Sequence, residues 1–184
     1  MQVLLDPDAT TRGLRRVANE LIEHPGASGR LVLIAIGRGG VPVARDLRLW
    51  LRKLEPGEVP LGTIDVELYE DGTTTTFAEP RVGLSSIPCS LDGARVVLVD
   101  DVIQTGRTVR AAIGAVTGLG RPRTIELCTL VNRGGRVFPI QPDFFVRRLE
   151  LPTEQRVDVL DDTRGLRVVV QRASNTLPPL PSNP

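Results

Sequence analysis

Short apolar runs alternate along the chain with segments whose apolar residues recur at helical spacing. Three largely apolar runs have the length and composition of strands buried on both faces; they span residues 31–36, 95–101 and 124–131. Helical spacing is found in residues 8–24, 42–52 and 107–117. Because parallel strands must be joined by a crossover, this alternation predicts an α/β fold with a mainly parallel sheet flanked by helices.

Weaker patterns complete the predicted architecture. Apolar and polar residues alternate from Ile64 to Tyr69, which indicates a strand with one solvated face, and the polar segment 71–81 predicts a long loop. Three shorter strands are expected at residues 144–149, 156–160 and 166–171. We expect a single domain over residues 1–172. Residues 173–184 contain four prolines and no charge, which predicts a disordered tail.

Composition is that of an ordinary globular protein and excludes several other classes. The chain has 184 residues, of which 41 % are hydrophobic and 24 % charged, so wholesale disorder and fibrous repeats are excluded. The apolar runs are too short to cross a bilayer and no secretory signal is recognisable, so we expect a cytoplasmic protein. Two cysteines and one histidine disfavour a disulfide framework, a Cys/His metal site and a histidine-activated nucleophile. A net charge of +1 does not by itself indicate a nucleic-acid partner.

Ligands of parallel α/β folds bind in loops beyond the carboxyl ends of the strands. Three segments of this chain follow such strand ends and contain glycine. They are residues 37–40, 100–107 and 132–141. The predicted fold therefore brings these three segments together at one edge of the sheet.

The second of these segments has the clearest chemical meaning. Asp100 and Asp101 end a buried strand, and a turn containing Gly106 then runs directly into a helix. Free backbone amides at a helix start bind anions, and glycine lets a phosphate approach the chain closely. The hydroxyls of Thr105 and Thr108 can donate to that phosphate, while the carboxylates can accept from vicinal hydroxyls. The pattern predicts a ribose-phosphate ligand; the alternatives are a magnesium site or a plain acidic strand end before a capped helix.

Residues 97–108 resemble the phosphoribosyl pyrophosphate (PRPP) signature of the type I phosphoribosyltransferases. Further matching segments point to one branch of these enzymes; they are residues 61–69, 92–93, 119–122, 131–134, 136, 139–140 and 151–153. Together they resemble the PyrR family of bifunctional pyrimidine operon attenuators and uracil phosphoribosyltransferases. The resemblance runs from about residue 6 to residue 170, which is nearly the whole chain.

This resemblance implies a type I phosphoribosyltransferase fold with a small hood region and a flexible active-site loop. It implies transfer of the ribose 5-phosphate of PRPP to uracil, giving UMP and diphosphate. Asp100 and Asp101 would hold the ribose hydroxyls and would be catalytic residues together with Arg38. The residues implied to bind PRPP or UMP are Asp100, Asp101, Gln104, Thr105, Gly106, Arg107 and Thr108. Mg²⁺ would be held mainly by substrate oxygens and water, with no direct protein ligand.

Three further segments have expected roles by the same resemblance. The expected pyrophosphate loop is Gly37, Arg38, Gly39 and Gly40, although these residues also suit a simple strand-to-helix turn. The flexible loop is rooted at Tyr69, Glu70 and Asp71. The expected base-side loop comprises Val131, Asn132, Arg133, Phe138, Pro139 and Ile140. Phe138 is expected either to pack on the base or to belong to the core.

The family also implies regulation through RNA. UMP-bound members bind a hairpin in the leader of pyrimidine-biosynthesis mRNA, through a basic face that extends across a homodimer. The candidates for this face are Arg12, Arg15, Arg16, Arg136, Arg147 and Arg148, although these side chains would equally suit a solvated surface. Two other functions stay open: a phosphoribosyltransferase for another base, and a nucleotide-sensing regulator with little catalysis.

Overall fold

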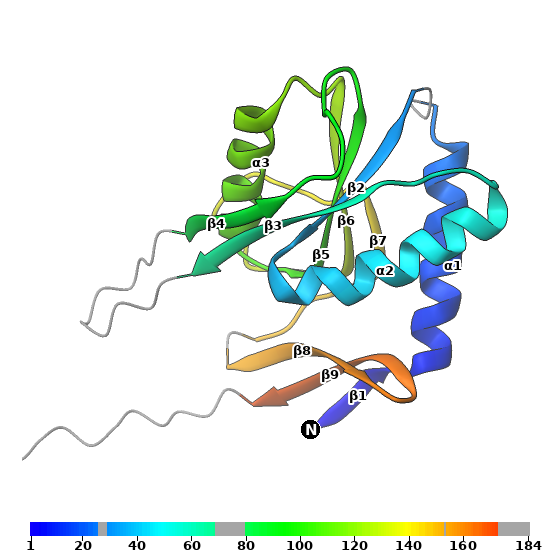
Figure 1. Cartoon of the computed structure of the whole chain (residues 1–184). Coiled ribbons are helices and arrows are strands. Elements are labelled where there is room, and N and C mark those ends of the chain that lie inside the picture. Colours follow the sequence, from blue (N-terminus) through cyan, green and yellow to red (C-terminus); the bar gives the residue numbers. More distant parts are fainter. Residues whose placement is uncertain (26–28, 69–79, 153, 173–184) are drawn as a thin grey trace, which may run out of the picture.

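The computed structural model describes residues 1–25, 29–68, 80–152 and 154–172. They form a six-stranded sheet with helices on both faces and a separate three-stranded sheet (Figure 1). The predicted α/β fold with a mainly parallel sheet is therefore confirmed. The expected tail and the root of the flexible loop at Tyr69, Glu70 and Asp71 lie outside the described residues.

The larger sheet has the strand order β4-β3-β2-β5-β6-β7, in which β4 is an antiparallel edge and the other neighbours are parallel. Its strands are β2 (Leu31–Ile36), β3 (Leu61–Leu68), β4 (Pro80–Ser86), β5 (Arg95–Ile103), β6 (Thr124–Arg133) and β7 (Phe144–Leu149). The central pair β2 and β5 is fully buried through most of its length. Burial on both faces explains why these strands read as continuous apolar runs.

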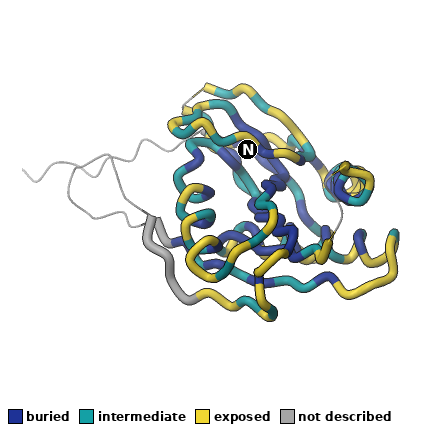
Figure 2. The backbone as a smooth tube through the Cα atoms, turned by 90° about the horizontal axis from the view of Figure 1, so that it is seen from above, coloured by how far each residue is buried: buried dark blue, intermediate teal, exposed yellow. Residues whose placement is uncertain are grey.

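Three helices cover the two faces of this sheet. They are α1 (Pro7–Glu23), α2 (Gly37–Leu54) and α3 (Arg107–Leu119). One face packs on α1 and α2, with Val17 and Leu47 in the same buried cluster as Val97. The other face packs on α3, where Val109 joins a second cluster. Figure 2 shows buried residues running along the inner stretches of the chain, with exposed residues outside them.

The three-stranded sheet is the hood. It consists of β1 (Gln2–Leu5), β8 (Gln155–Asp162) and β9 (Gly165–Arg172), paired antiparallel in the order β1-β9-β8. Val157 and Val168 belong to the same buried cluster as α1 and α2, so the hood shares a core with the larger sheet. It lies across from the end of β5 (Figure 1). The strand β1 was not predicted from the sequence.

Several predicted boundaries differ from the structure. Helix α2 begins at Gly37, directly after β2, so Pro42 is its sixth residue and does not lie in its first turn. Strand β5 continues to Ile103 and β6 to Arg133, because parallel pairing between them extends to Ile103 and Asn132. The strand β4 was not predicted, and it begins at Pro80 within the segment expected to be a loop. The other helices and strands agree with prediction to within about three residues.

A buried ion pair ties α1 to the middle of the sheet. The Arg95 side chain donates to Glu126 at 2.7 Å and to the Leu21 carbonyl at 2.8 Å. Both charged residues are buried, since Arg95 is 1 % and Glu126 9 % exposed. The carbonyl of Leu21 lies near the C-terminal end of α1, so this one guanidinium joins two strands and a helix.

We predict that Glu126→Gln destabilises the protein by about 3–5 kcal/mol, because it leaves a buried guanidinium without its counter-charge. Urea unfolding measures the free energy. The matched control is Glu150→Gln, which removes the exposed partner of Arg148 and is expected to cost less than about 1 kcal/mol. A cost for Glu126→Gln as small as that of the control would contradict this account of the ion pair.

Candidate functional site

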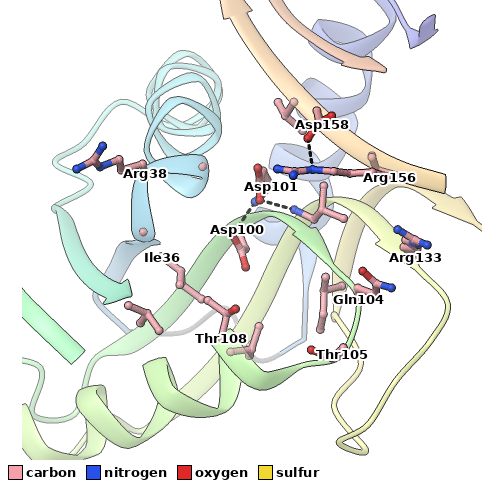
Figure 3. Close-up of a pocket in the computed structure, with 18 of the residues that line it drawn as sticks. Ile36, Arg38, Asp100, Asp101, Gln104, Thr105, Thr108, Arg133, Arg156 and Asp158 are labelled. Atoms are coloured by element: carbon pink, nitrogen blue, oxygen red, sulfur yellow. Dashed lines mark hydrogen bonds and ion pairs between the residues drawn. The ribbon is translucent and has the colours of Figure 1, made fainter. Parts of the chain in front are cut away.

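A cavity of about 820 Å³ opens at the carboxyl end of β5. Its walls are the end of β5 and the following turn, the start of α2, and strands β8 and β9 of the hood (Figure 3). The sequence-predicted residues that line it are Gly37, Arg38, Gly39, Asp100, Asp101, Gln104, Thr105, Gly106, Thr108 and Arg133. Two of the three segments expected to meet at this edge therefore line it substantially, whereas residues 132–141 contribute only Arg133.

The two adjacent carboxylates are held in place by the backbone. Asp100 Oδ1 accepts the amide of Asp101 at 2.9 Å, and Asp101 Oδ1 accepts the amide of Val102 at 2.7 Å. Asp100 is only 6 % exposed. This burial, followed by the charge of Asp101, raises the pKa of Asp100 well above its usual value. The pair is thus oriented before any ligand arrives and favours a bound proton or a hydrogen-bond donor.

The turn after β5 has the features of an anion site. We call residues 103–106 the phosphate turn. Gly106 adopts the left-handed conformation with φ +84° and, having no side chain, provides no N-cap hydrogen bond to the helix α3 that follows. The Thr105 hydroxyl accepts the amide of Arg107 at 3.3 Å and also lies at the cavity wall. Uncapped amides at a helix start attract anions, so the local geometry agrees with the predicted phosphate position.

The start of α2 approaches the end of β5 very closely. A Cβ atom on Gly39 would lie 2.5 Å from Asp101 Oδ2, and one on Gly40 would lie 2.3 Å from the Val99 carbonyl oxygen. These glycines are therefore required by packing, and Gly40 does not itself line the cavity. Arg38 is exposed at the cavity rim, and Figure 3 shows its guanidinium directed away from the two aspartates. Its expected contact with pyrophosphate stays a prediction.

The expected base-side loop lies behind the phosphate turn. Of its residues only Arg133 lines the cavity, where its Nη2 donates to the Pro152 carbonyl at 3.0 Å. The Nε of Arg133 is buried without a hydrogen-bond partner in the described part of the chain. The guanidinium groups of Arg107 and Arg110 lie over the aromatic ring of Phe138. Phe138 is thus placed against α3. The residues of the expected base-side loop other than Arg133 do not line the cavity; they are Val131, Asn132, Phe138, Pro139 and Ile140.

Five of the six arginines expected to contact RNA are exposed on neighbouring elements. Arg12, Arg15 and Arg16 project from α1, while Arg147 and Arg148 project from β7. Arg16 joins the two elements by donating to the carbonyls of Phe145 and Val146. The sixth, Arg136, differs from this expectation because it donates hydrogen bonds to the phosphate turn and to the loop that contains it.

Three polar hood residues at the cavity were missed by the sequence analysis, together with three apolar ones beside them. The polar residues are Arg156, Asp158 and Gln171. Arg156 donates to Asp158 at 2.7 Å, and both lie across the cavity from the aspartates (Figure 3). The sequence predicted only a short strand at residues 156–160. No local signal indicates that this strand covers the end of β5.

The phosphoribosyl transferase domain family matches residues 3–161 of the chain. A protein of Pelotomaculum thermopropionicum named Bifunctional protein PyrR is 45 % identical over 156 residues, covering 85 % of each chain. A protein of the same name from Synechocystis is 46 % identical over 167 residues, covering 88 % of this chain and 91 % of its own. The chain belongs to the PyrR family. The resemblance inferred from the sequence is thereby confirmed for the family and for the fold.

Solved structures of phosphoribosyltransferases agree with the fold of this PyrR-family chain. A purine phosphoribosyltransferase from Pyrococcus horikoshii superposes with a TM-score of 0.62 at 29 % identity, covering 79 % of this chain and 85 % of that one. A hypoxanthine phosphoribosyltransferase from Trypanosoma cruzi, in complex with the product IMP, gives a TM-score of 0.70 at 21 % identity. The second likeness covers 91 % and 93 % of the two chains and is evidence for the fold alone.

Two properties of the described residues bear on other kinds of site. Their helices include none with the length and apolar character needed to cross a membrane. Those residues also contain no group of three or more histidine, cysteine, aspartate or glutamate side chains placed to hold a metal ion. Among the described residues, the carboxylates that line the cavity are those of Asp100, Asp101 and Asp158.

We predict that Asp100→Asn stabilises the unliganded protein at neutral pH. A carboxyl with a raised pKa binds more protons in the folded than in the unfolded state, so its contribution to stability falls as pH rises above about 4, the ordinary aspartate value. Each unit of raised pKa corresponds to about 1.4 kcal/mol, or roughly 3–5 °C in melting temperature for a domain of this size. Calorimetry between pH 4 and 8 measures the difference.

The exposed Glu154→Gln variant is the control for this pH series. Its melting curve should follow that of the unaltered protein at every pH. If Asp100→Asn melted at the same temperature as the unaltered protein from pH 4 to pH 8, the described electrostatics of the aspartate pair would be wrong.

Proposed function

We propose that this protein transfers the ribose 5-phosphate of PRPP to uracil, and that it is also a UMP-dependent RNA-binding regulator of pyrimidine-biosynthesis operons. The observation that carries the catalytic part is the cavity at the end of β5. There two backbone-oriented carboxylates adjoin an uncapped helix start. Membership of the PyrR family supports both parts.

Each part of PRPP would have its own wall of the cavity. The 5′-phosphate would lie at the amides and hydroxyls between Gln104 and Thr108, and the ring hydroxyls would donate to Asp100 and Asp101. Pyrophosphate would face the start of α2, where Arg38 is exposed. Uracil would then lie below the hood near Arg133, whose buried Nε has an unused donor.

Catalysis in this geometry is positioning and charge stabilisation. The bond between the anomeric carbon and pyrophosphate breaks with its electrons on the leaving oxygen, and the new bond forms to a ring nitrogen of uracil, which loses its proton. The anomeric carbon gains positive charge in between, and the nearby carboxylates stabilise it. Asp101 is a candidate acceptor for the proton, although its role toward the ribose hydroxyls comes first.

Magnesium is the expected cofactor. Two carboxylates with one oxygen each engaged by an amide fit a cation that is bound mainly through substrate oxygens and water. Bound Mg²⁺ would neutralise the departing pyrophosphate. Asp100 and Asp101 would hold the ribose hydroxyls of the substrate that carries such a cation.

The RNA-binding part rests on the basic surface shared by α1 and β7. Arg12, Arg15, Arg147 and Arg148 are exposed there, and hydrogen bonds from Arg16 join the two elements. A hairpin longer than one protomer's surface would need two copies, so we propose that the protein acts as a homodimer or larger oligomer in the cytoplasm.

The test of catalysis offers the purified protein PRPP and Mg²⁺ with uracil, cytosine, hypoxanthine or guanine in turn. We expect UMP from uracil, and a loss of at least a hundredfold in kcat/KM for Asp101→Asn because ribose positioning is lost. The control is Asp161→Asn, an exposed carboxylate of the hood hairpin. Product from a purine only would make it a transferase for another base. No product at all would favour the regulator with little catalysis.

The test of regulation measures binding of a leader hairpin of pyrimidine-operon mRNA with and without UMP. We expect UMP to tighten binding and Arg147→Gln to weaken it several-fold. Each lost phosphate contact lowers the slope of log affinity against log salt by about 0.7–0.9. The control is Arg164→Gln, an exposed arginine of the hood hairpin. Equal affinities for Arg147→Gln and the unaltered protein would remove this surface from RNA binding.

A further inference from the structure

Arg136 makes more hydrogen bonds within the fold than a surface arginine needs. Its Nε donates to the Ile140 carbonyl at 2.7 Å, and its Nη2 donates to Asn132 Oδ1 at 2.6 Å. Its Nη1 lies 2.6 Å from the carbonyl oxygens of both Gln104 and Arg133, and 3.1 Å from that of Ile103. One planar guanidinium thus joins the phosphate turn to residues 133–140, which we call the support loop.

Backbone bonds reinforce the same connection. The amides of Val137 and Phe138 both donate to the Thr105 carbonyl, at 3.0 and 3.1 Å. With the two bonds from Arg136, the carbonyls of three consecutive residues, Ile103 to Thr105, all accept from the support loop. Three of the four carbonyls of the turn therefore accept hydrogen bonds from the support loop.

This arrangement determines where the amides of the turn point. In a trans peptide the carbonyl and the following N–H project in opposite directions, and the described chain has no cis peptide bond. Fixing the carbonyls of residues 103–105 toward the support loop therefore directs the amides of Gln104, Thr105 and Gly106 to the other side. All three of these residues line the cavity.

Packing behind the turn acts in the same direction. A Cβ on Gly106 would lie 3.5 Å from the Phe138 Cβ and 3.7 Å from the Ile140 Cβ, so the support loop is in close contact with the glycine. Burial of Arg136, followed by the charge of Arg148, lowers the pKa of the guanidinium, while Glu150 raises it. The side chain is thus partly withdrawn from water.

We propose that Arg136 is a positioning residue for phosphate binding: it holds the phosphate turn so that its amides face the ligand. Neither Arg136 nor residues 137–140 line the cavity in the described structure, so the support loop acts through the turn. This role replaces the expected contact of Arg136 with RNA. The identity of the anion rests on the proposed function, whereas the connection itself does not.

The experiment compares Arg136→Met and Arg136→Lys with Arg164→Met, an exposed arginine of the hood hairpin. Calorimetric titration with ribose 5-phosphate measures phosphate binding, and NMR hydrogen exchange of the Val137 and Phe138 amides measures the connection to the turn. We expect at least tenfold weaker binding and faster exchange for Arg136→Met. Arg136→Lys keeps the charge but cannot supply the planar set of donors, so we expect a loss of at least threefold. Arg164→Met should change neither quantity.

Each outcome bears on the proposal separately from the proposed function. If ribose 5-phosphate failed to bind the unaltered protein, the proposed function would fail. If amide exchange of Val137 and Phe138 were slower or unchanged in the Arg136 variants, the positioning role would be overturned. Ribose 5-phosphate affinity within twofold of the unaltered protein in the Lys variant would also overturn it, even if the Met variant did not fold. Loss of hairpin binding with unchanged ribose 5-phosphate affinity would return Arg136 to the RNA surface.

Discussion

The candidate site depends on the conformation of four residues, the last residue of β5 and the three that connect it to α3. Gly106 has a positive φ that few other residues adopt readily, and it offers no N-cap side chain to the start of α3. The carbonyls before it are bonded to the support loop, so the amides face the cavity. Every role assigned to the cavity presupposes this turn, because it determines where an anion binds and how the rest of a ribose phosphate must extend.

The second constraint is the close approach of the start of α2 to the end of β5, beside the two aspartates. Gly39 and Gly40 let the start of α2 lie against Asp101 and the carbonyl of Val99. This close packing also buries Asp100, and the burial raises the pKa of its carboxyl because the charged form is poorly solvated without a ligand. A group that destabilises the unliganded fold at neutral pH is typical of a site organised for binding.

Much of this architecture could be predicted because its signals are local. Strands β2 and β5 appear as apolar runs since they are buried on both faces, and Asp100, Asp101 and Gly106 are adjacent in sequence to the strand that positions them. The contacts that were missed join distant segments. Arg156 reaches the cavity only because the hood folds back over β5, and Arg136 is separated from Ile103 by 33 residues.

The same reasoning explains why residues 37–40 and the support loop have different places in the structure from those expected. Residues 37–40 suited either a loop or a turn, and only their packing against β5 makes them the first turn of α2. The support loop has the composition of a ligand loop, with glycine, arginine and an aromatic residue. Its hydrogen bonds nevertheless go to the back of the phosphate turn, and a sequence does not reveal on which side of a turn a neighbouring loop lies.

The most direct measurement of the central claim is a crystal structure of the protein with UMP. The account predicts phosphate oxygens within hydrogen-bond distance of the backbone amides between Thr105 and Val109, with the ribose hydroxyls at Asp100 and Asp101. A well-ordered UMP whose phosphate lies elsewhere, with those amides bonded to protein side chains instead, would contradict it.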